Sequence, residues 1–267
     1  QPLSNLIHHE GISHRSDEPG GLKVHQTINR RKFRDRWGAV IEREHAERYW
    51  DVLRGHDRPA DREMILVVDH YIPQPDRDAG SRSMWCILRT LVKMGLVVKF
   101  WPQNQANDPD YVDWLQQAGV EVIVGDEVRD NFAGWLAANG HRLKYVLLSR
   151  PTVAPEFLPL VRKRTRARVL FYGHDLHHAR LHREYQLTGS ETARREAESF
   201  RKMEHDLWRE ADVVYYPSYE ETAAVRAAVP QVQAHTMPLF FFDEAPRVEG
   251  PGSRKDILFV AGFAHPP

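Results

Sequence analysis

Polar side chains follow a hydrophobic run in the middle of this chain, where His174 stands beside Asp175 in the segment 173–178. The run before them, 168–172, has the length and composition of a buried strand. A histidine next to a carboxylate can keep one tautomer, and it can hydrogen-bond or protonate a ligand oxygen near neutral pH. The pattern therefore predicts that His174 contacts a ligand.

Two more histidines, His178 and His182, are four residues apart just downstream. On a helix this spacing places both imidazoles on one face, where they could ligate a metal ion together with His174 and Asp175. A metal-dependent hydrolase is therefore one alternative, and a solvated turn without a ligand is another. The hydrolase is disfavoured because His-Asp phosphohydrolases are all-helical, whereas this pair follows a predicted strand.

A second candidate loop, 70–83, follows the hydrophobic run 64–69. It delivers Gly80 and Ser81 to a helix start, with Arg82 beside them. Backbone N–H groups at a helix N-terminus and a guanidinium can receive a phosphate or a sugar hydroxyl. A surface loop whose serine caps the helix is the alternative, since the segment lacks the G-x-G-x-x-G pattern of dinucleotide sites.

Short hydrophobic runs alternate with segments of helical period from residue 64 onward. The predicted strands are 64–69, 97–101, 120–124, 145–149, 168–172 and 213–217. The predicted helices are 84–95, 108–119, 126–140, 154–164, 190–211 and 218–228. Strands that alternate with helices this regularly predict an α/β fold with a doubly wound, Rossmann-like parallel sheet covered on both faces. Ligands of such sheets lie at the carboxyl ends of the strands, where both candidate loops fall.

The remaining segments predict the domain organisation. Residues 1–62 form a helical or irregular N-terminal extension, with a helix over 42–54. Residues 63–245 form the Rossmann-like domain, and residues 246–267 form a linker and the first strand of a second α/β domain. We expect a segment of a longer protein, because the chain starts without Met and stops after a predicted strand and a glycine turn.

Composition disfavours several classes of protein. Lys plus Arg equals Asp plus Glu at 37 each, so no basic field predicts a nucleic-acid partner. Cys86 is the single cysteine, which rules out an internal disulfide and is typical of a reducing compartment. Because no window has about 18 consecutive apolar residues, we predict a cytoplasmic protein whose membrane contact, if any, is peripheral at the inner face.

The motifs, taken in order, resemble the family-four glycosyltransferases of GT-B fold. The resemblance covers residues 64–267, roughly the N-terminal, acceptor-side half of such an enzyme. It rests on ILVVDH at 65–70 with Asp76, Asp78, Gly80 and Ser81, on GHDLHH at 173–178, on LW and ADVV within 207–214, on PS at 217–218, and on GF and HPP within 262–267.

The opening residues 8–37 resemble the C-terminal end of a family-two glycosyltransferase domain of GT-A fold. Two transferases in tandem are a common arrangement in bacterial surface-polysaccharide synthesis. The resemblance therefore implies upstream and downstream domains of the same polypeptide.

The family-four resemblance implies transfer of a sugar from a nucleotide-diphosphate donor to a glycan or lipid-linked saccharide acceptor. It further implies retention at the anomeric carbon, without a metal or other cofactor. His174 matches the family's active-site histidine near the donor sugar, and Asp175 is a further candidate. Gly80 matches the glycine of the first loop, which approaches donor phosphate and acceptor. Gly262 and Phe263 match the loop that begins the nucleotide-binding half.

The family's Glu-x7-Glu donor motif would lie beyond Pro267. We therefore expect the segment by itself to be nearly inactive. A non-catalytic Rossmann-like domain that docks a partner transferase or the membrane is the third hypothesis, beside the glycosyltransferase and the metal-dependent hydrolase.

Overall fold

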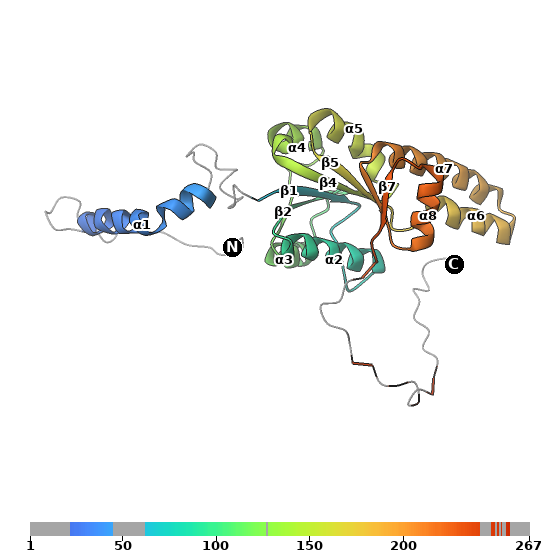
Figure 1. Ribbon diagram of the computed structural model, residues 1–267, viewed down its shortest axis with the longest axis horizontal. Coiled ribbons are helices and arrows are strands. Elements are labelled where there is room, and N and C mark those ends of the chain that lie inside the picture. The colour runs from blue at the N-terminus through green and yellow to red at the C-terminus, as the bar shows by residue number, and fades with distance from the viewer. Residues whose placement is uncertain are drawn as a thin grey trace.

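The computed structural model describes residues 22–44, 62–126 and 128–240, and a few isolated positions between 247 and 256. One sheet of seven strands forms its centre (Figure 1). The strand order is β3-β2-β1-β4-β5-β6-β7, and all neighbours pair in parallel. With helices on both faces, this order confirms the predicted doubly wound, Rossmann-like sheet.

The hydrophobic runs of the sequence become the strands of this sheet. They are β1 (Met64–Asp69), β2 (Val97–Pro102), β3 (Val120–Val122), β4 (Leu143–Ser149), β5 (Arg168–Tyr172), β6 (Val213–Tyr216) and β7 (Gln233–Thr236). The first six match predicted strands to within a few residues. The sequence does not predict β7, because this edge strand has the polar sequence QAHT and buries only Ala234.

Helices cover the two faces of the sheet unequally. On one face lie α2 (Ala79–Lys93) and α3 (Pro109–Gln117), which pack against the strands around β1 and β2. On the other lie α4 (Phe132–Asn139), α5 (Ala154–Arg164), α7 (Glu191–Glu210) and α8 (Tyr219–Ala228). A single turn, η2 (Gly140–Arg142), links α4 to β4. The helices predicted between the strands are thus all present.

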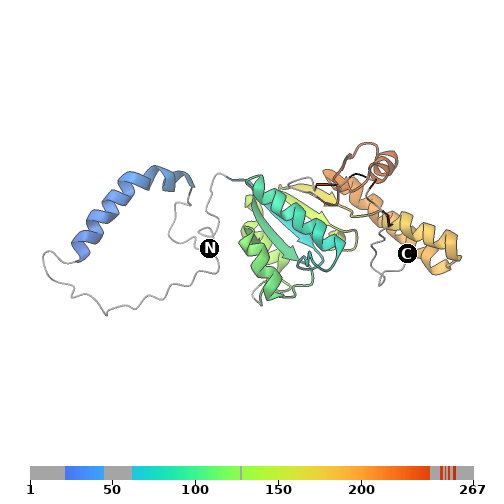
Figure 2. The same cartoon turned by 90° about the horizontal axis from the view of Figure 1, so that it is seen from below.

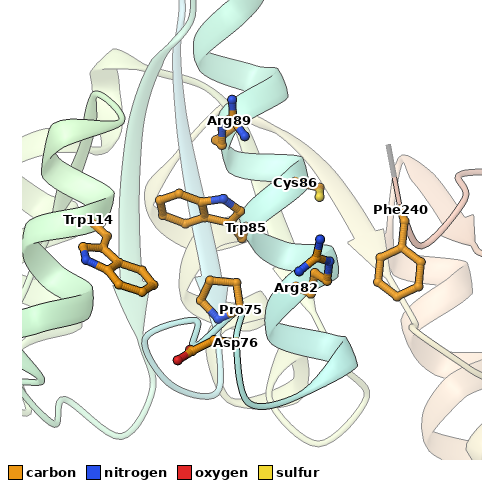
Figure 3. Close-up of a pocket in the computed structure, with 8 residues that line it drawn as sticks. All are labelled: Pro75, Asp76, Arg82, Trp85, Cys86, Arg89, Trp114 and Phe240. Carbon is orange, nitrogen blue, oxygen red and sulfur yellow. The ribbon is translucent and has the colours of Figure 1, made fainter. Parts of the chain in front are cut away.

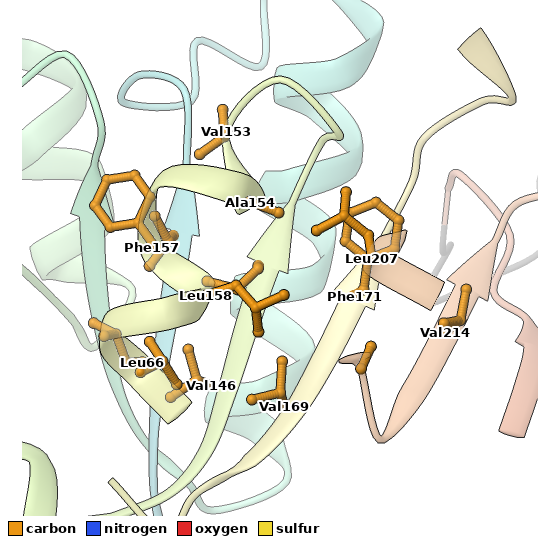
Figure 4. Close-up of a cluster of buried hydrophobic side chains, with 14 of the residues drawn as sticks. Leu66, Val146, Val153, Ala154, Phe157, Leu158, Val169, Phe171, Leu207 and Val214 are labelled. Carbon is orange, nitrogen blue, oxygen red and sulfur yellow. The ribbon is translucent and has the colours of Figure 1, made fainter. Parts of the chain in front are cut away.

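The core lies on both faces because alternate residues of a strand point to opposite sides. In β1, Leu66 and Val68 pack into the cluster under α5 and α7, which Figure 4 shows. Ile65 and Val67 pack into the cluster under α2 and α3. All four are at most 1% exposed, and each such side chain contributes roughly 1.5–3 kcal/mol by leaving water.

Two helices lie outside the predicted pattern. The helix α6 (His177–Thr188) packs along α7, and only Leu181 of its side chains is buried, so no apolar stripe marks it in the sequence. The helix α1 (Leu22–Glu44) lies apart from the sheet (Figures 1 and 2), within the predicted N-terminal extension. Its Arg, Lys, Gln and Glu residues favour a helix without an apolar face. Most of the predicted helix 42–54 and the predicted strand 256–260 lie outside the described residues.

The order of the strands fixes where a ligand can bind. The chain moves outward through β1, β2 and β3, then returns to β4 beside β1 and continues to β7. At such a reversal the loops leave β1 and β4 in opposite directions, and a crevice opens at the carboxyl ends of the strands. The last residues of β1, β4 and β5 therefore face the place where a functional site is expected. None of the described helices is long and apolar enough to span a membrane.

Candidate functional site

A buried ion pair joins the carboxyl ends of β1 and β4. Asp69 ends β1 and is 3% exposed, and its Oδ1 accepts a hydrogen bond from Nε of Arg150, the residue after β4, at 2.7 Å. The same carboxylate oxygen accepts the backbone N–H of His70. The neighbouring Asp69 carboxylate raises the pKa of Arg150 although burial alone would lower it. Arg150 is therefore a fixed cation at the reversal of the sheet.

The loop after β1 brings the start of α2 against this cation. Asp78 caps α2, because its Oδ1 accepts the N–H of Ser81 at 2.8 Å, while its Oδ2 accepts the hydroxyls of Ser81 and Tyr71. Burial alone would raise the pKa of Asp78, but these hydrogen bonds and Arg150 keep it below its ordinary value. A Cβ on Gly80 would lie 2.8 Å from Nη2 of Arg150, so a side chain there would push the guanidinium away.

His174 lies next to this ion pair, at the carboxyl end of β5. Its Nε2 and the Oγ of Ser149, the last residue of β4, are 2.7 Å apart and hydrogen-bonded. Its ring packs on Tyr172, with the centroids 4.5 Å apart. Among the described residues, none hydrogen-bonds Nδ1, so this nitrogen is open to a ligand in the cavity that His174 lines.

The backbone of His174 is held in a conformation that favours glycine. Its φ is 64° and that of Arg150 is 69°, so two of the four described non-glycine residues with positive φ lie in this one site. Such a conformation costs on the order of 1–3 kcal/mol and persists where the surroundings over-determine it, which happens often at functional sites. Together, Asp69, Ser149, Arg150 and His174 form what we call the His174 site.

Burial sets the protonation state of His174. Removal from water lowers the pKa of the imidazole from 6.5 to about 4, and Asp69 opposes this shift while Arg150 supports it. The ring is therefore neutral at pH 7. A neutral imidazole can donate one hydrogen bond and accept another, but it is not a reservoir of positive charge.

Asp175, the second predicted residue, faces a different set of partners. Its carboxylate forms an ion pair with Nδ1 of His177 at 2.9 Å and with Nε of Arg180 at 3.1 Å. Burial alone would raise the pKa of Asp175, but these partners keep it below its ordinary value. For His177 the directions are reversed. Burial alone would lower the pKa of its imidazole, but the Asp175 carboxylate raises it above its ordinary value. The adjacent residues His174 and Asp175 are thus neighbours in sequence without sharing a hydrogen bond.

A separate group of polar side chains, the Glu204 network, anchors the start of α6 to α7. Glu204 on α7 is 0% exposed and accepts the backbone N–H groups of His177 and His178 at 3.0 and 3.1 Å. It also contacts Nδ1 of His178 at 2.5 Å and the hydroxyl of Tyr216, which in turn accepts Nε1–H of Trp208. Every oxygen of this carboxylate has a partner, as a buried carboxylate requires.

The predicted metal cluster is not assembled. His174 hydrogen-bonds Ser149, His178 contacts Glu204, and His182 lies 3.2 Å from Nε2 of Gln186. In the described part of the chain, no three His, Cys, Asp or Glu side chains are grouped so that they could hold a metal ion. The geometry therefore gives no support to the hydrolase hypothesis.

A cavity of about 690 Å³ opens beside His174, and that volume lies within the ~300–1,000 Å³ typical of small-molecule sites. Its wall consists of His174, Asp175, Pro217, Ser218, Glu221, Pro238, Leu239 and Phe240. Ser218 and Glu221 form a capping box at the start of α8, so their polar atoms are already engaged. The Asp175 carboxylate is likewise paired with His177 and Arg180, so His174 supplies the main open hydrogen-bonding group at this cavity.

The predicted contact residues separate in space. Gly80 lies against Arg150 in the His174 site, whereas the N–H and hydroxyl of Ser81 are both bound to Asp78. Arg82 is exposed and lies on the outer face of α2 (Figure 3). Gly262 and Phe263 lie outside the described residues.

Sequence reasoning missed three members of the site, Asp69, Ser149 and Arg150. A signal for each was present, since each is polar or charged and stands at the carboxyl end of a hydrophobic run. What the sequence lacks is the strand order, which alone shows that the ends of β1, β4 and β5 meet.

Comparison with known proteins yields a likeness of fold. No family model and no curated protein matches the chain. One similar solved structure is UGT73P12 of Glycyrrhiza uralensis, complexed with glycyrrhetinic acid 3-O-monoglucuronide, at 9% identity and a TM-score of 0.44. The likeness covers 67% of this chain and 49% of that structure, so the chain spans about half of the length of its neighbour. A likeness this loose indicates neither substrate nor reaction.

Proposed function

We propose that this chain is the acceptor-side part of a glycosyltransferase, which moves a sugar from a nucleotide diphosphate to a hydroxyl of a saccharide. The ordered motifs of the sequence support the proposal, and so does their position at the carboxyl edge of the sheet. The observation that carries it is His174, which is half-buried, neutral and held at positive φ beside a cavity of about 690 Å³.

In this proposal His174 acts as a hydrogen-bonding group. Ser149 holds Nε2, which leaves Nδ1 to contact a hydroxyl of the sugar that is transferred. Because the imidazole is neutral, it orients this hydroxyl without drawing the charged leaving diphosphate towards itself. A hydrogen-bonding group that is already held in place contributes by preorganisation, since it does not have to rearrange during the reaction.

The ion pair of Asp69 and Arg150 has a second role in the proposal. The carboxylates of Asp69 and Asp78 outnumber the Arg150 cation that lies between them, and Arg82 lies on the outer face of α2, so this side of the helix start favours neutral hydroxyls over a phosphate. We therefore place an acceptor or donor hydroxyl near Gly80, where the absence of a side chain lets the guanidinium of Arg150 approach the backbone. Ser81 then supports the loop through Asp78, and the diphosphate is bound by residues outside the described chain, such as Gly262 and Phe263.

Other parts of the proposal rest on the sequence resemblance. These are retention at the anomeric carbon, a nucleotide-sugar donor without a metal, a place in bacterial surface-polysaccharide synthesis, and a cytoplasmic location. An active enzyme requires the nucleotide-binding half, so the proposal concerns the whole natural polypeptide.

The experiment is a transfer assay on that whole polypeptide. Release of nucleoside diphosphate is measured with a panel of UDP-, GDP- and dTDP-sugars, first for the wild type and then for His174→Ala. The matched control is His182→Ala, because His182 is exposed on α6 and lies away from the cavity. We expect His174→Ala to lose about 100-fold or more in turnover, and the control to stay active.

Two outcomes would overturn this proposal. One is equal turnover of His174→Ala and the wild type. The other is a wild type that turns over none of the nucleotide sugars while a partner transferase depends on this domain, which is the docking hypothesis.

A further inference from the structure

A second cavity lies on the outer face of α2, away from the His174 site. It has a volume of about 300 Å³, and we call it the α2 pocket (Figure 3). Arg82 and Trp85 line it from α2, Trp114 from α3, Pro75 and Asp76 from the loop after β1, and Phe240 from the segment after β7. No part of the proposed reaction uses these side chains.

The walls of the α2 pocket are braced before any ligand arrives. The hydroxyl of Tyr111 donates to Oδ1 of Asp76 at 2.8 Å, and the guanidinium of Arg77 lies 5.4 Å from the centre of the Tyr111 ring. The same ring packs edge-on against Trp114, with the centroids 5.1 Å apart. Trp114 is nevertheless 44% exposed, so a rigid aromatic face is left open to a ligand.

The chemistry of this pocket matches a sugar ring. A sugar presents apolar C–H faces that pack on indole rings, here those of Trp85 and Trp114. Its hydroxyls both donate and accept hydrogen bonds, for which Asp76 is an acceptor and Arg82 a donor. A phosphate would use the guanidinium groups of Arg82 and Arg89, but it would leave both indole faces unused and would lie beside the Asp76 carboxylate.

The α2 pocket and the cavity beside His174 have one wall residue in common. Phe240 lines both, so a ligand that extends past this ring would reach from one to the other. Figure 3 shows Phe240 and Trp114 on opposite sides of Arg82 and Trp85. An extended chain of sugar units is a ligand with this shape, whereas a flat membrane surface would not enter a recess.

We propose that the α2 pocket binds a saccharide unit of the acceptor, one or more units away from the hydroxyl that reacts at His174. This assignment rests on the proposed function for the identity of the ligand as an acceptor. Binding of a saccharide at Trp85 and Trp114 can be measured without any transfer reaction.

The test is binding of the fluorescently labelled full chain to a printed array of bacterial and synthetic glycans, without a nucleotide sugar. We expect a defined set of saccharides to bind, and Trp114→Ala to weaken this binding by about tenfold or more, as loss of an aromatic anchor does. Arg82→Gln tests the polar side of the pocket in the same way. Circular dichroism confirms that each variant is folded.

Two controls separate this proposal from the proposed function. Arg183→Ala replaces an exposed arginine of α6, remote from the pocket, and leaves glycan binding unchanged. His174→Ala abolishes transfer, yet it retains glycan binding if the α2 pocket is a site of its own. If no transfer is found but glycan binding still depends on Trp114, the α2 pocket is a saccharide site and the transferase proposal is wrong.

The remaining outcomes overturn the inference. One is an absence of binding to every glycan on the array, and another is binding that folded Trp114→Ala and Arg82→Gln both retain. Capture on vesicles of phosphatidylglycerol, lost in Trp114→Ala while no glycan binds, would identify a membrane contact in place of a saccharide site.

Discussion

His174 and the pair formed by His177 and His178 are separated by only two residues in the chain, yet their surroundings are opposite. His177 and His178 start α6 and belong to the Glu204 network, in which the carboxylate contacts two backbone N–H groups, an imidazole and a phenol. His174 has one partner, Ser149, and otherwise faces a ring and a cavity. The first group is saturated with protein contacts, and the second has capacity left for a ligand.

The difference shows how the polar residues 174–178, which look alike in the sequence, can be divided by their hydrogen bonds. A buried polar group with all its hydrogen bonds made stabilises the fold, whereas one with an open nitrogen beside a cavity can bind. Backbone conformation points the same way, because His174 has a φ of 64° while His177 and His178 lie in a regular helix. We therefore assign a structural role to the Glu204 network and propose a functional one for the His174 site.

The largest effect on stability is expected for Glu204→Ala. This change leaves His178, two backbone N–H groups and Tyr216 without their shared acceptor in a fully buried place. We expect the free energy of unfolding to fall by about 3–5 kcal/mol, as measured by urea denaturation. Glu198→Ala on the same helix is the matched control, because its side chain is 69% exposed and its change should be within about 0.5 kcal/mol. Equal losses would contradict the assignment of Glu204.

The next effect is a dependence of stability on pH that belongs to His174. Its pKa is about 4 in the folded protein and ordinarily 6.5. The unfolded chain therefore takes up a proton first as the pH falls, and stability is lost between pH 6.5 and 4. The full loss is roughly 3 kcal/mol. The free energy of unfolding is measured for the wild type and for His174→Gln at pH 7 and at pH 4, and the wild type should lose more of it between the two pH values. An NMR titration follows the protonation of the His174 ring directly. Titration of His174 near 6.5 would show that the ring is not buried.

A smaller loss of stability is expected at Gly173, which lies between the His174 site and the Glu204 network. A Cβ on Gly173 would lie 2.2 Å from ring atoms of Tyr216, whose hydroxyl belongs to the Glu204 network. Gly173→Ala should lower the free energy of unfolding by about 1–3 kcal/mol, because the buried ring must shift. Gly95→Ala separates steric conflict from backbone strain, since Gly95 has a φ of 87° and a Cβ added there would meet no atom within 4 Å. If Gly173→Ala is harmless in thermal denaturation, the packing between the two groups is looser than described.

The smallest effect distinguishes a structural hydrogen bond from a functional one. Ser149→Ala removes the partner of His174, and Ser83→Ala removes an equally buried hydroxyl that contacts Tyr172. Each should lower stability by about 0.5–1.5 kcal/mol. Transfer by the whole polypeptide should fall only for Ser149→Ala, because the imidazole is then free to turn. Equal transfer rates for the two variants would remove Ser149 from the site.

Much of this arrangement is predictable from the sequence, because hydrophobic runs are local signals. The runs at 64–69 and 168–172 became β1 and β5 with the predicted bounds, and the capping box of Ser218 and Glu221 begins α8 as its spacing indicates. The prominence of His174 after β5 was likewise visible, since polar residues that follow a buried strand lie at the ligand edge of a parallel sheet.

The parts that sequence reasoning missed depend on contacts between distant residues. Asp69 and Arg150 are 81 positions apart, and only the placement of β4 beside β1 makes them a pair. The helix α6 has no apolar stripe, and its start is anchored by Glu204, which is 27 residues after His177 in the chain. No local pattern encodes either contact.

The most direct test of the account compares His174→Ala with His178→Ala in one preparation of the whole polypeptide. The quantity is turnover of the nucleotide sugar per folded molecule, measured together with the free energy of unfolding. We predict that His174→Ala loses about 100-fold in turnover and no more stability than the roughly 0.5–1.5 kcal/mol of its hydrogen bond. We predict that His178→Ala loses more stability, while its folded molecules keep their turnover. The reverse pattern, with turnover lost at His178 and retained at His174, would contradict the division between the two groups.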